Sequence, residues 1–113
     1  MCTENQLSII VNRVAEQAKA IFGNKMRAVI LYGSYARGDY DDESDIDIMV
    51  LADVPREELS SYKKAFWTLT SELGLAYDIV VTVTLKDVYT FEKYFDAVPF
   101  YQAVRKEGVS IAV

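Results

Sequence analysis

The chain has 113 residues, of which 51% are hydrophobic and 26% charged, and its net charge is −5 at pH 7. This hydrophobic content excludes a disordered chain, and the length suits one core, so residues 1–113 are predicted to form a single domain. Histidine is absent and the one cysteine is Cys2. These counts exclude Ser-His-Asp and Cys-His catalysis, an intrachain disulfide and a cysteine-based zinc site, and we expect Cys2 to be inert near the terminus.

The start of the chain lacks the pattern of a signal peptide, and no apolar run approaches the roughly 18 residues that suggest a membrane span. We therefore expect a cytoplasmic protein that does not engage a membrane. Six acids and no base lie between Asp39 and Asp47, and without them the net charge would be +1. The acidity is thus local, and the absence of a general basic patch argues against binding duplex nucleic acid.

The first predicted element is an amphipathic helix, because apolar residues recur every three or four positions from Leu7 to Phe22. Gly23-Asn24 is expected to end it. The apolar run Ala28–Tyr32 is typical of a buried strand, which ends at Gly33. A second strand is predicted over Asp45–Leu51 from its alternating pattern, and this alternation directs both acids of Asp45-Ile46-Asp47 to one face of the strand.

A second long helix is predicted from Pro55 to Gly74, because apolar residues recur with helical spacing between them. The β-branched segment Ala76–Leu85 indicates a third strand. Asp78 would lie on the same face of that strand as Val80 and Thr82. A buried, unpaired carboxylate costs several kcal/mol, so Asp78 should have a charged partner or a metal ion.

The chain is expected to finish with two short helices and an extended end, over about Lys86–Phe95, Pro99–Gly108 and Val109–Val113. Helices alternating with strands favour an α/β (α+β) fold with a small mixed sheet of three to four strands and helices packed mainly on one face. Periodicity alone does not give the directions of the strands.

The segment from Gly33 to Asp47 carries the clearest functional signal. Gly33-Ser34 ends a strand where a helical turn can begin, and exposed backbone N–H groups at such a start can bind phosphate oxygens. The Cα atoms of Asp45 and Asp47 should lie about 7 Å apart on one strand face. If Asp78 lies on the neighbouring strand, three carboxylates meet there, and Mg²⁺ shared with substrate phosphates would neutralise them. The chemistry expected of such a site is phosphoryl or nucleotidyl transfer.

These motifs resemble the nucleotidyltransferases of the DNA polymerase beta superfamily, which combine Gly-Ser, a spacer, Asp-x-Asp on a strand and a third acid on a later strand. The longer pattern, Gly-Ser-x-Ala-Arg-Gly at Gly33–Gly38 and Ser-Asp-Ile-Asp at Ser44–Asp47, is similar to the minimal nucleotidyltransferase (MNT) group. The resemblance covers nearly the whole chain.

The resemblance implies transfer of a nucleoside monophosphate, AMP from ATP, to a hydroxyl. It assigns the triphosphate to Gly33 and Ser34, two Mg²⁺ ions to Asp45 and Asp47, and a shared metal-binding and proton-accepting role to Asp78. It also implies a HEPN-domain toxin as partner, which MNT proteins neutralise by adenylylating a tyrosine.

Several alternatives remain open from the sequence. The chain could neutralise a partner by binding alone, or it could modify a small aminoglycoside-like alcohol with an acceptor site supplied by a homo-oligomer.

Arg37 is either an ordinary exposed arginine or a contact to the triphosphate or the acceptor. Ser34 can be a helix cap as well as a phosphate ligand, and Asp78 could be a structural acid. The remaining acids, Asp41, Asp42 and Glu43, are expected to lie in a solvated loop, and a calcium-binding EF-hand is excluded because its required Gly and Glu are replaced by Ser44 and Val50.

Overall fold

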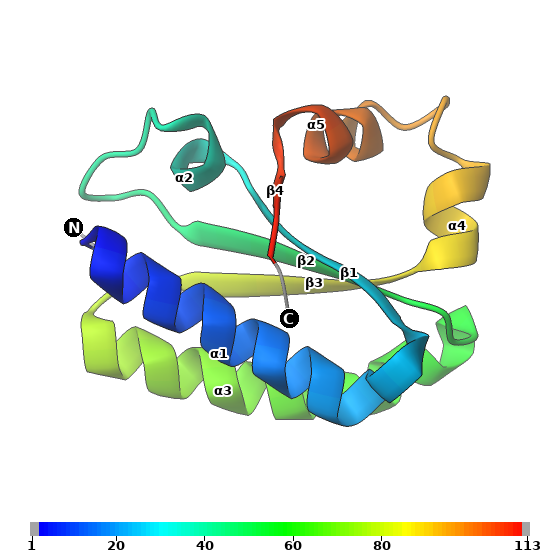
Figure 1. The fold of residues 1–113 in the computed structure, drawn as a ribbon, viewed down its shortest axis with the longest axis horizontal. Helices are drawn as coiled ribbons and strands as arrows, with labels where there is room; N and C mark the ends of the chain where they lie inside the picture. Colours follow the sequence, from blue (N-terminus) through cyan, green and yellow to red (C-terminus); the bar gives the residue numbers. More distant parts are fainter. Residues whose placement is uncertain (1–2, 112–113) are drawn as a thin grey trace.

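The protein was analysed as a computed structural model that describes residues 3–111. Figure 1 shows a four-stranded sheet, in the order β3-β2-β1-β4, with helices on both faces. The strands are β1 (Met26–Tyr32), β2 (Ile46–Ala52), β3 (Val81–Asp87) and β4 (Val109–Ser110). β1 is antiparallel to β2 and β4, whereas β2 and β3 are parallel. The predicted α+β class with a small mixed sheet is confirmed.

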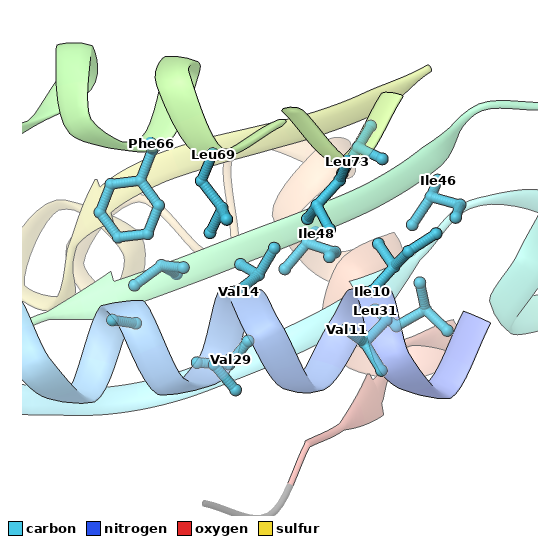
Figure 2. Close-up of a cluster of buried hydrophobic side chains, with 14 of the residues drawn as sticks. Ile10, Val11, Val14, Val29, Leu31, Ile46, Ile48, Phe66, Leu69 and Leu73 are labelled. Carbon is cyan, nitrogen blue, oxygen red and sulfur yellow. The ribbon is translucent and has the colours of Figure 1, made fainter. Parts of the chain in front are cut away.

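Two long helices, α1 (Glu4–Phe22) and α3 (Lys63–Tyr77), cover one face of the sheet, as predicted. Figure 2 shows their apolar side chains meeting those of β1 and β2 in the main core. The side chain of Thr3 accepts a hydrogen bond from the backbone N–H of Gln6, and the Gln6 side chain accepts one from the backbone N–H of Thr3, so α1 begins with a capping box. The labelled core residues are Ile10, Val11, Val14, Val29, Leu31, Ile46, Ile48, Phe66, Leu69 and Leu73.

The opposite face of the sheet carries three short helices, α2 (Ser34–Arg37), α4 (Val88–Lys93) and α5 (Pro99–Glu107). A smaller buried cluster lies there, with Met49 and Leu51 of β2 against side chains of α4 and α5. Because side chains alternate along a strand, Asp47 belongs to the same face as Met49 and Leu51. The acid pair therefore lies on the face away from the main core.

The boundary between α3 and β3 corrects the sequence prediction. The segment after Pro55 first forms a 3₁₀ helix, η2 (Arg56–Tyr62), and α3 then continues through Gly74 to Tyr77. The expected strand from Ala76 begins only at Val81. Gly74 allows a close return of the chain, since a Cβ there would lie 2.9 Å from the carbonyl oxygen of Ile79. Gly74, which was predicted to end the helix, thus lies inside α3 and permits close packing there.

The other boundaries differ by smaller amounts. β2 starts at Ile46, so Asp45 precedes the strand, and α4 is shorter than the predicted helix at Lys86–Phe95. α5 agrees with its prediction. In the extended end, Val109 and Ser110 form β4, whereas residues 112–113 and Cys2 lie outside the described residues. Within residues 3–111, no helix combines the length and the apolar character needed to cross a bilayer.

Candidate active site

Gly33 forms the turn that joins β1 to α2. Its backbone has φ 80° and ψ −158°, and its carbonyl oxygen accepts hydrogen bonds from the N–H groups of Ala36 and Arg37, both at 3.1 Å. Ser34 is half-buried and begins the helix. The predicted change from a strand to a helical turn at Gly33-Ser34 is therefore present, with a glycine in a conformation that other residues rarely adopt.

The side chain of Asp47 packs directly against the backbone of Gly33. A Cβ atom on Gly33 would lie 2.5 Å from Oδ2 of Asp47 and 3.4 Å from its Cγ. The sheet produces this contact, because the register of β1 and β2 pairs Tyr32, the residue before Gly33, with Asp47. The turn and the acid strand, separated by the whole acidic loop in sequence, thus form one site.

Asp45 and Asp47 form an electrostatically coupled pair. Asp45 is exposed and Asp47 is half-buried. Burial raises the pKa of the Asp47 carboxyl, the charge of Asp45 raises it further, and the Arg37 guanidinium partly offsets both effects. Two neighbouring carboxylates are stabilised by a cation, and Mg²⁺ commonly binds one or two carboxylates together with water and substrate phosphates. The donor set therefore fits Mg²⁺.

Asp78 is not on β3, so its predicted place on the strand face is wrong. It follows α3 as its C-cap in the left-handed conformation, with φ 51°, and its side chain is exposed. The β3 residue in register with Asp47 is Thr82. Asp78 instead lines a hollow of about 340 Å³ that Asp45 also lines. Among residues 3–111, no group of three acidic, histidine or cysteine side chains is placed to hold a metal ion together.

Arg37 connects α2 with the end of α5. Its guanidinium forms ion pairs with Asp39, at 3.1 Å, and with Glu107, at 3.3 Å. Hydrogen bonds to Asp39 and then Glu107 raise the pKa of Arg37 above its usual value. The position is exposed, as an ordinary surface arginine would be, yet the charge also acts on Asp47.

The acidic loop has its own internal structure. The Asp41 carboxylate accepts a hydrogen bond from the backbone N–H of Glu43 at 2.9 Å, and the Ser44 hydroxyl oxygen accepts one from the N–H of Asp41 at 2.9 Å. Earlier in the loop, the Tyr40 ring stacks on Tyr35 with centroids 4.3 Å apart. Asp41 and Ser44 therefore fold the turn that leads into Asp45.

Tyr32 and Thr84 are neighbours of the acid pair that the sequence analysis missed. The Tyr32 hydroxyl lies 3.4 Å from Oγ1 of Thr84, and Phe100 packs edge-on against the Tyr32 ring with centroids 5.5 Å apart. Burial raises the pKa of Tyr32, the hydrogen bond with Thr84 opposes this effect, and the charge of Asp47 adds to the rise. Only the register of three strands brings these groups together, and nothing in the sequence pattern indicated it.

Comparison with known proteins gives the family. The nucleotidyltransferase domain family matches residues 11–108. Protein MJ0141 of Methanocaldococcus jannaschii, provisionally named a protein adenylyltransferase, is 33% identical over 92 residues, covering 81% of this chain and 91% of that protein.

Two solved structures have a similar fold. A toxin–antitoxin structure with AMP-PNP aligns with 88% of this chain and 69% of that one, at 25% identity and a TM-score of 0.52. A provisionally named nucleotidyltransferase of Sulfolobus solfataricus aligns with 94% of this chain and 78% of that one, at 24% identity and a TM-score of 0.56. The second similarity concerns the fold alone. Because the family match spans nearly the whole chain and is joined by a relative that covers most of it, this protein belongs to the nucleotidyltransferase domain family.

Proposed function

We propose that this protein transfers AMP from ATP to a hydroxyl group of a partner protein in a Mg²⁺-dependent reaction. The observation that carries the proposal is the contact between Gly33 and Oδ2 of Asp47, because it joins a turn suited to phosphate with a carboxylate pair suited to a divalent cation. Membership of the nucleotidyltransferase domain family supports the class of reaction.

In this proposal the triphosphate lies along the turn at the start of α2. Gly33 allows the phosphates to approach the backbone, and Ser34 contributes hydrogen-bond donors at the same place. Arg37 supplies positive charge beside them. Its ion pairs with Asp39 and Glu107 support this role by holding the guanidinium between α2 and α5.

Asp45 and Asp47 would hold two Mg²⁺ ions in the proposal, together with oxygens of the triphosphate. Bound Mg²⁺ would neutralise charge on the phosphates during transfer. We keep Asp78 as the third carboxylate of the proposed site, but its position near Asp45 now supports this role in place of a position on β3. It shares a hollow with Asp45, whereas the strand position beside Asp47 belongs to Thr82.

The proposed reaction is a single substitution at the α-phosphorus of ATP. The acceptor oxygen forms a bond to the α-phosphorus, the bond from that phosphorus to the bridging oxygen breaks, and pyrophosphate leaves with the electron pair. The acceptor hydroxyl gives its proton to the Asp78 carboxylate, which is exposed and so within reach of a partner protein. Gly33, Ser34 and Arg37 hold the triphosphate in line for this attack.

The proposed acceptor is a tyrosine of a HEPN-type toxin, which would make this protein an antitoxin. The motif Gly33–Gly38 with Ser44–Asp47 supports this choice, as do the name of the M. jannaschii relative and the toxin–antitoxin structure with AMP-PNP. A protein acceptor also suits a site whose hollow at Asp45 and Asp78 is open to solvent rather than enclosed.

The test is incubation of the protein with α-labelled ATP, Mg²⁺ and a HEPN-type protein from the same organism. We expect label on the HEPN protein, lost when tyrosine is replaced there and lost with the Asp45→Asn, Asp47→Asn double variant. Asp41→Asn serves as the matched control in the same acidic loop and should retain transfer, because the asparagine oxygen can still accept the hydrogen bond from the N–H of Glu43. Unchanged labelling by the double variant would refute the assignment. Full toxin suppression by that variant, with binding intact, would favour neutralisation by binding alone.

A further inference from the structure

β3 is an edge strand of seven residues, in which every second residue has backbone groups that are not paired with β2. The order of the described sheet places β2 on one side of β3 and no strand on the other. The N–H of Ile46 donates to the carbonyl of Val80 at 2.9 Å. In a parallel pair the residues that bond to the neighbouring strand alternate, so Val80, Thr82 and Thr84 face β2. The N–H and C=O groups of Val81, Val83 and Leu85 point to the open edge, which can accept another strand.

A hollow of about 600 Å³ runs beside this edge, between β3 and the side of α3. Trp67 of α3 lines the hollow and is 70% exposed, and Val80 at the start of the edge is 59% exposed. A tryptophan in this position is a common anchor of protein interfaces. The edge therefore offers both backbone hydrogen bonds and apolar surface.

The charges along the edge have opposite signs at its two ends. Lys63 and Lys86 line the hollow near the carboxyl end of β3. Asp78 lies before the amino end, where Glu43 and Asp45 line the adjoining hollow. A second copy that runs antiparallel would bring the lysine end of each chain to the acidic end of the other. The charge pattern is thus self-complementary, as a two-fold symmetric interface requires.

We propose that two copies of this chain form a dimer through antiparallel pairing of their β3 strands, centred on Val83. Val83 is the middle one of the three residues with outward backbone groups, so it lies on the two-fold axis. The axis is perpendicular to the sheet, which becomes one continuous sheet of eight strands. The α3 helices then lie side by side on one face, with the Trp67 side chains near the axis.

This dimer completes the acidic site with a cation from the other copy. Lys86 is in register with Leu51 and lies over the Tyr101 ring, 5.8 Å from its centroid, so it belongs to the face of the sheet that carries Asp47. Pairing centred on Val83 sets Lys86 opposite Val80 of the second copy. The carbonyl oxygen of Val80 accepts a hydrogen bond from the N–H of Ile46, the residue that follows Asp45. Each protomer would thereby direct a lysine toward the carboxylates and phosphates of the other active site.

Sedimentation equilibrium of the full chain across the micromolar range tests the dimer without reference to catalysis. We expect twice the 12.8 kDa mass of one chain. Trp67→Glu should raise the dimer dissociation constant roughly tenfold or more, because the anchor becomes a charge. Leu75→Glu is the matched control, since Leu75 is 89% exposed on α3 but does not line the hollow. It should leave the dissociation constant unchanged.

Two further variants address the strand and the charges separately. Val83→Pro removes an outward N–H and no bond to β2, so the protein should remain folded by circular dichroism and become monomeric. Lys63→Glu should weaken the dimer, whereas Lys64→Glu, on the next residue of α3 and in a different hollow, should not. A single-chain mass at every concentration would overturn the proposal. A dimer unaffected by both Trp67→Glu and Lys63→Glu would overturn it as well, because another surface would then be the interface.

Discussion

The Gly33 backbone and the Asp47 carboxylate are packed so closely that a methyl group on Gly33 would lie 2.5 Å from Oδ2 of Asp47. This contact leaves room for the turn between β1 and α2 only if residue 33 has no side chain. It also ties the position of the turn to the position of the acid, so that changes at either residue should affect both nucleotide and metal binding.

Gly33→Ala should therefore destabilise the protein and abolish nucleotide binding. The backbone conformation of Gly33, with φ 80° and ψ −158°, costs about 1–3 kcal/mol for a residue with a side chain, and displacement of Asp47 adds to this cost. Gly23→Ala is the matched control, because Gly23 has a similar backbone conformation, with φ 56° and ψ −129°, but nothing within 4 Å of its Cβ position. Urea unfolding should show the larger loss for Gly33→Ala, and equal losses would contradict a specific contact with Asp47.

Asp47→Asn should stabilise the metal-free protein at neutral pH while removing transfer. The folded pKa of Asp47 lies above its usual 3.8, so the folded state binds this proton more tightly than the unfolded state does. The free energy of unfolding consequently falls as pH rises from 3.8 through the folded pKa, and it stays lower above that value. Asparagine lacks this penalty.

Thermal unfolding without divalent cations, followed from acidic to neutral pH, measures this effect. The midpoint advantage of Asp47→Asn should grow with pH over that window and then remain constant. Added Mg²⁺ with AMP-PNP should stabilise the wild type and not the variant, because ligand binding to the folded state raises stability. A variant that is less stable than the wild type at neutral pH would show that Asp47 has a structural partner instead.

Two substitutions at Asp78 distinguish the need for its backbone conformation from the need for its carboxylate. Its φ of 51° favours Gly, Asn or Asp, so Asp78→Asn should retain stability, whereas Asp78→Val should cost about 1–2 kcal/mol. The Asn variant then reports on the charge alone. We expect Asp78→Asn to reduce transfer less than Asp45→Asn does, since Asp78 lines the 340 Å³ hollow with Asp45 but is not next to Asp47 on the sheet. Initial rates of transfer from labelled ATP show which of the two variants is less active. Full activity of Asp78→Asn would contradict a role for Asp78 in the reaction.

Local patterns in the sequence predicted the elements that depend on local physics. The apolar run Ala28–Tyr32 and the alternation after Asp45 gave β1 and β2, and the glycine at position 33 gave the turn between β1 and α2. The end of α3 was not predictable in this way. Glycine often ends a helix, but Gly74 lies inside α3 and packs closely against the Ile79 carbonyl. That contact depends on the tertiary structure.

The relationships between strands were also beyond the sequence. A shift of one residue in register would turn Asp47 to the opposite face, and neither the pairing of Tyr32 with Asp47 nor that of Thr82 with Asp47 has a local signal. The same holds for Arg37 and Glu107, which are 70 residues apart in the chain and meet between α2 and α5. Spacing could thus point to Asp45, Asp47 and Asp78 as candidate acids, whereas the residues around them and the position of Asp78 outside β3 could not be predicted from it.

The ion pair between Arg37 and Glu107 leads to the last prediction. Both side chains are partly exposed, at 43% and 39%, so Glu107→Gln should change the free energy of unfolding by less than about 1 kcal/mol. Asp39 would still hold the guanidinium, and ATP affinity should persist. Arg37→Met should instead weaken ATP binding roughly tenfold, because a charge-assisted contact to phosphate is lost.

Arg27→Met is the matched control, since Arg27 has a similar exposed ion pair, with Asp53 at 3.0 Å, at the far end of β1. Calorimetric titration with AMP-PNP and Mg²⁺ measures all three variants. If Glu107→Gln weakened binding as much as Arg37→Met, the bridge between α2 and α5 would be the feature that matters, and Arg37 would act by positioning the helix rather than by contacting phosphate.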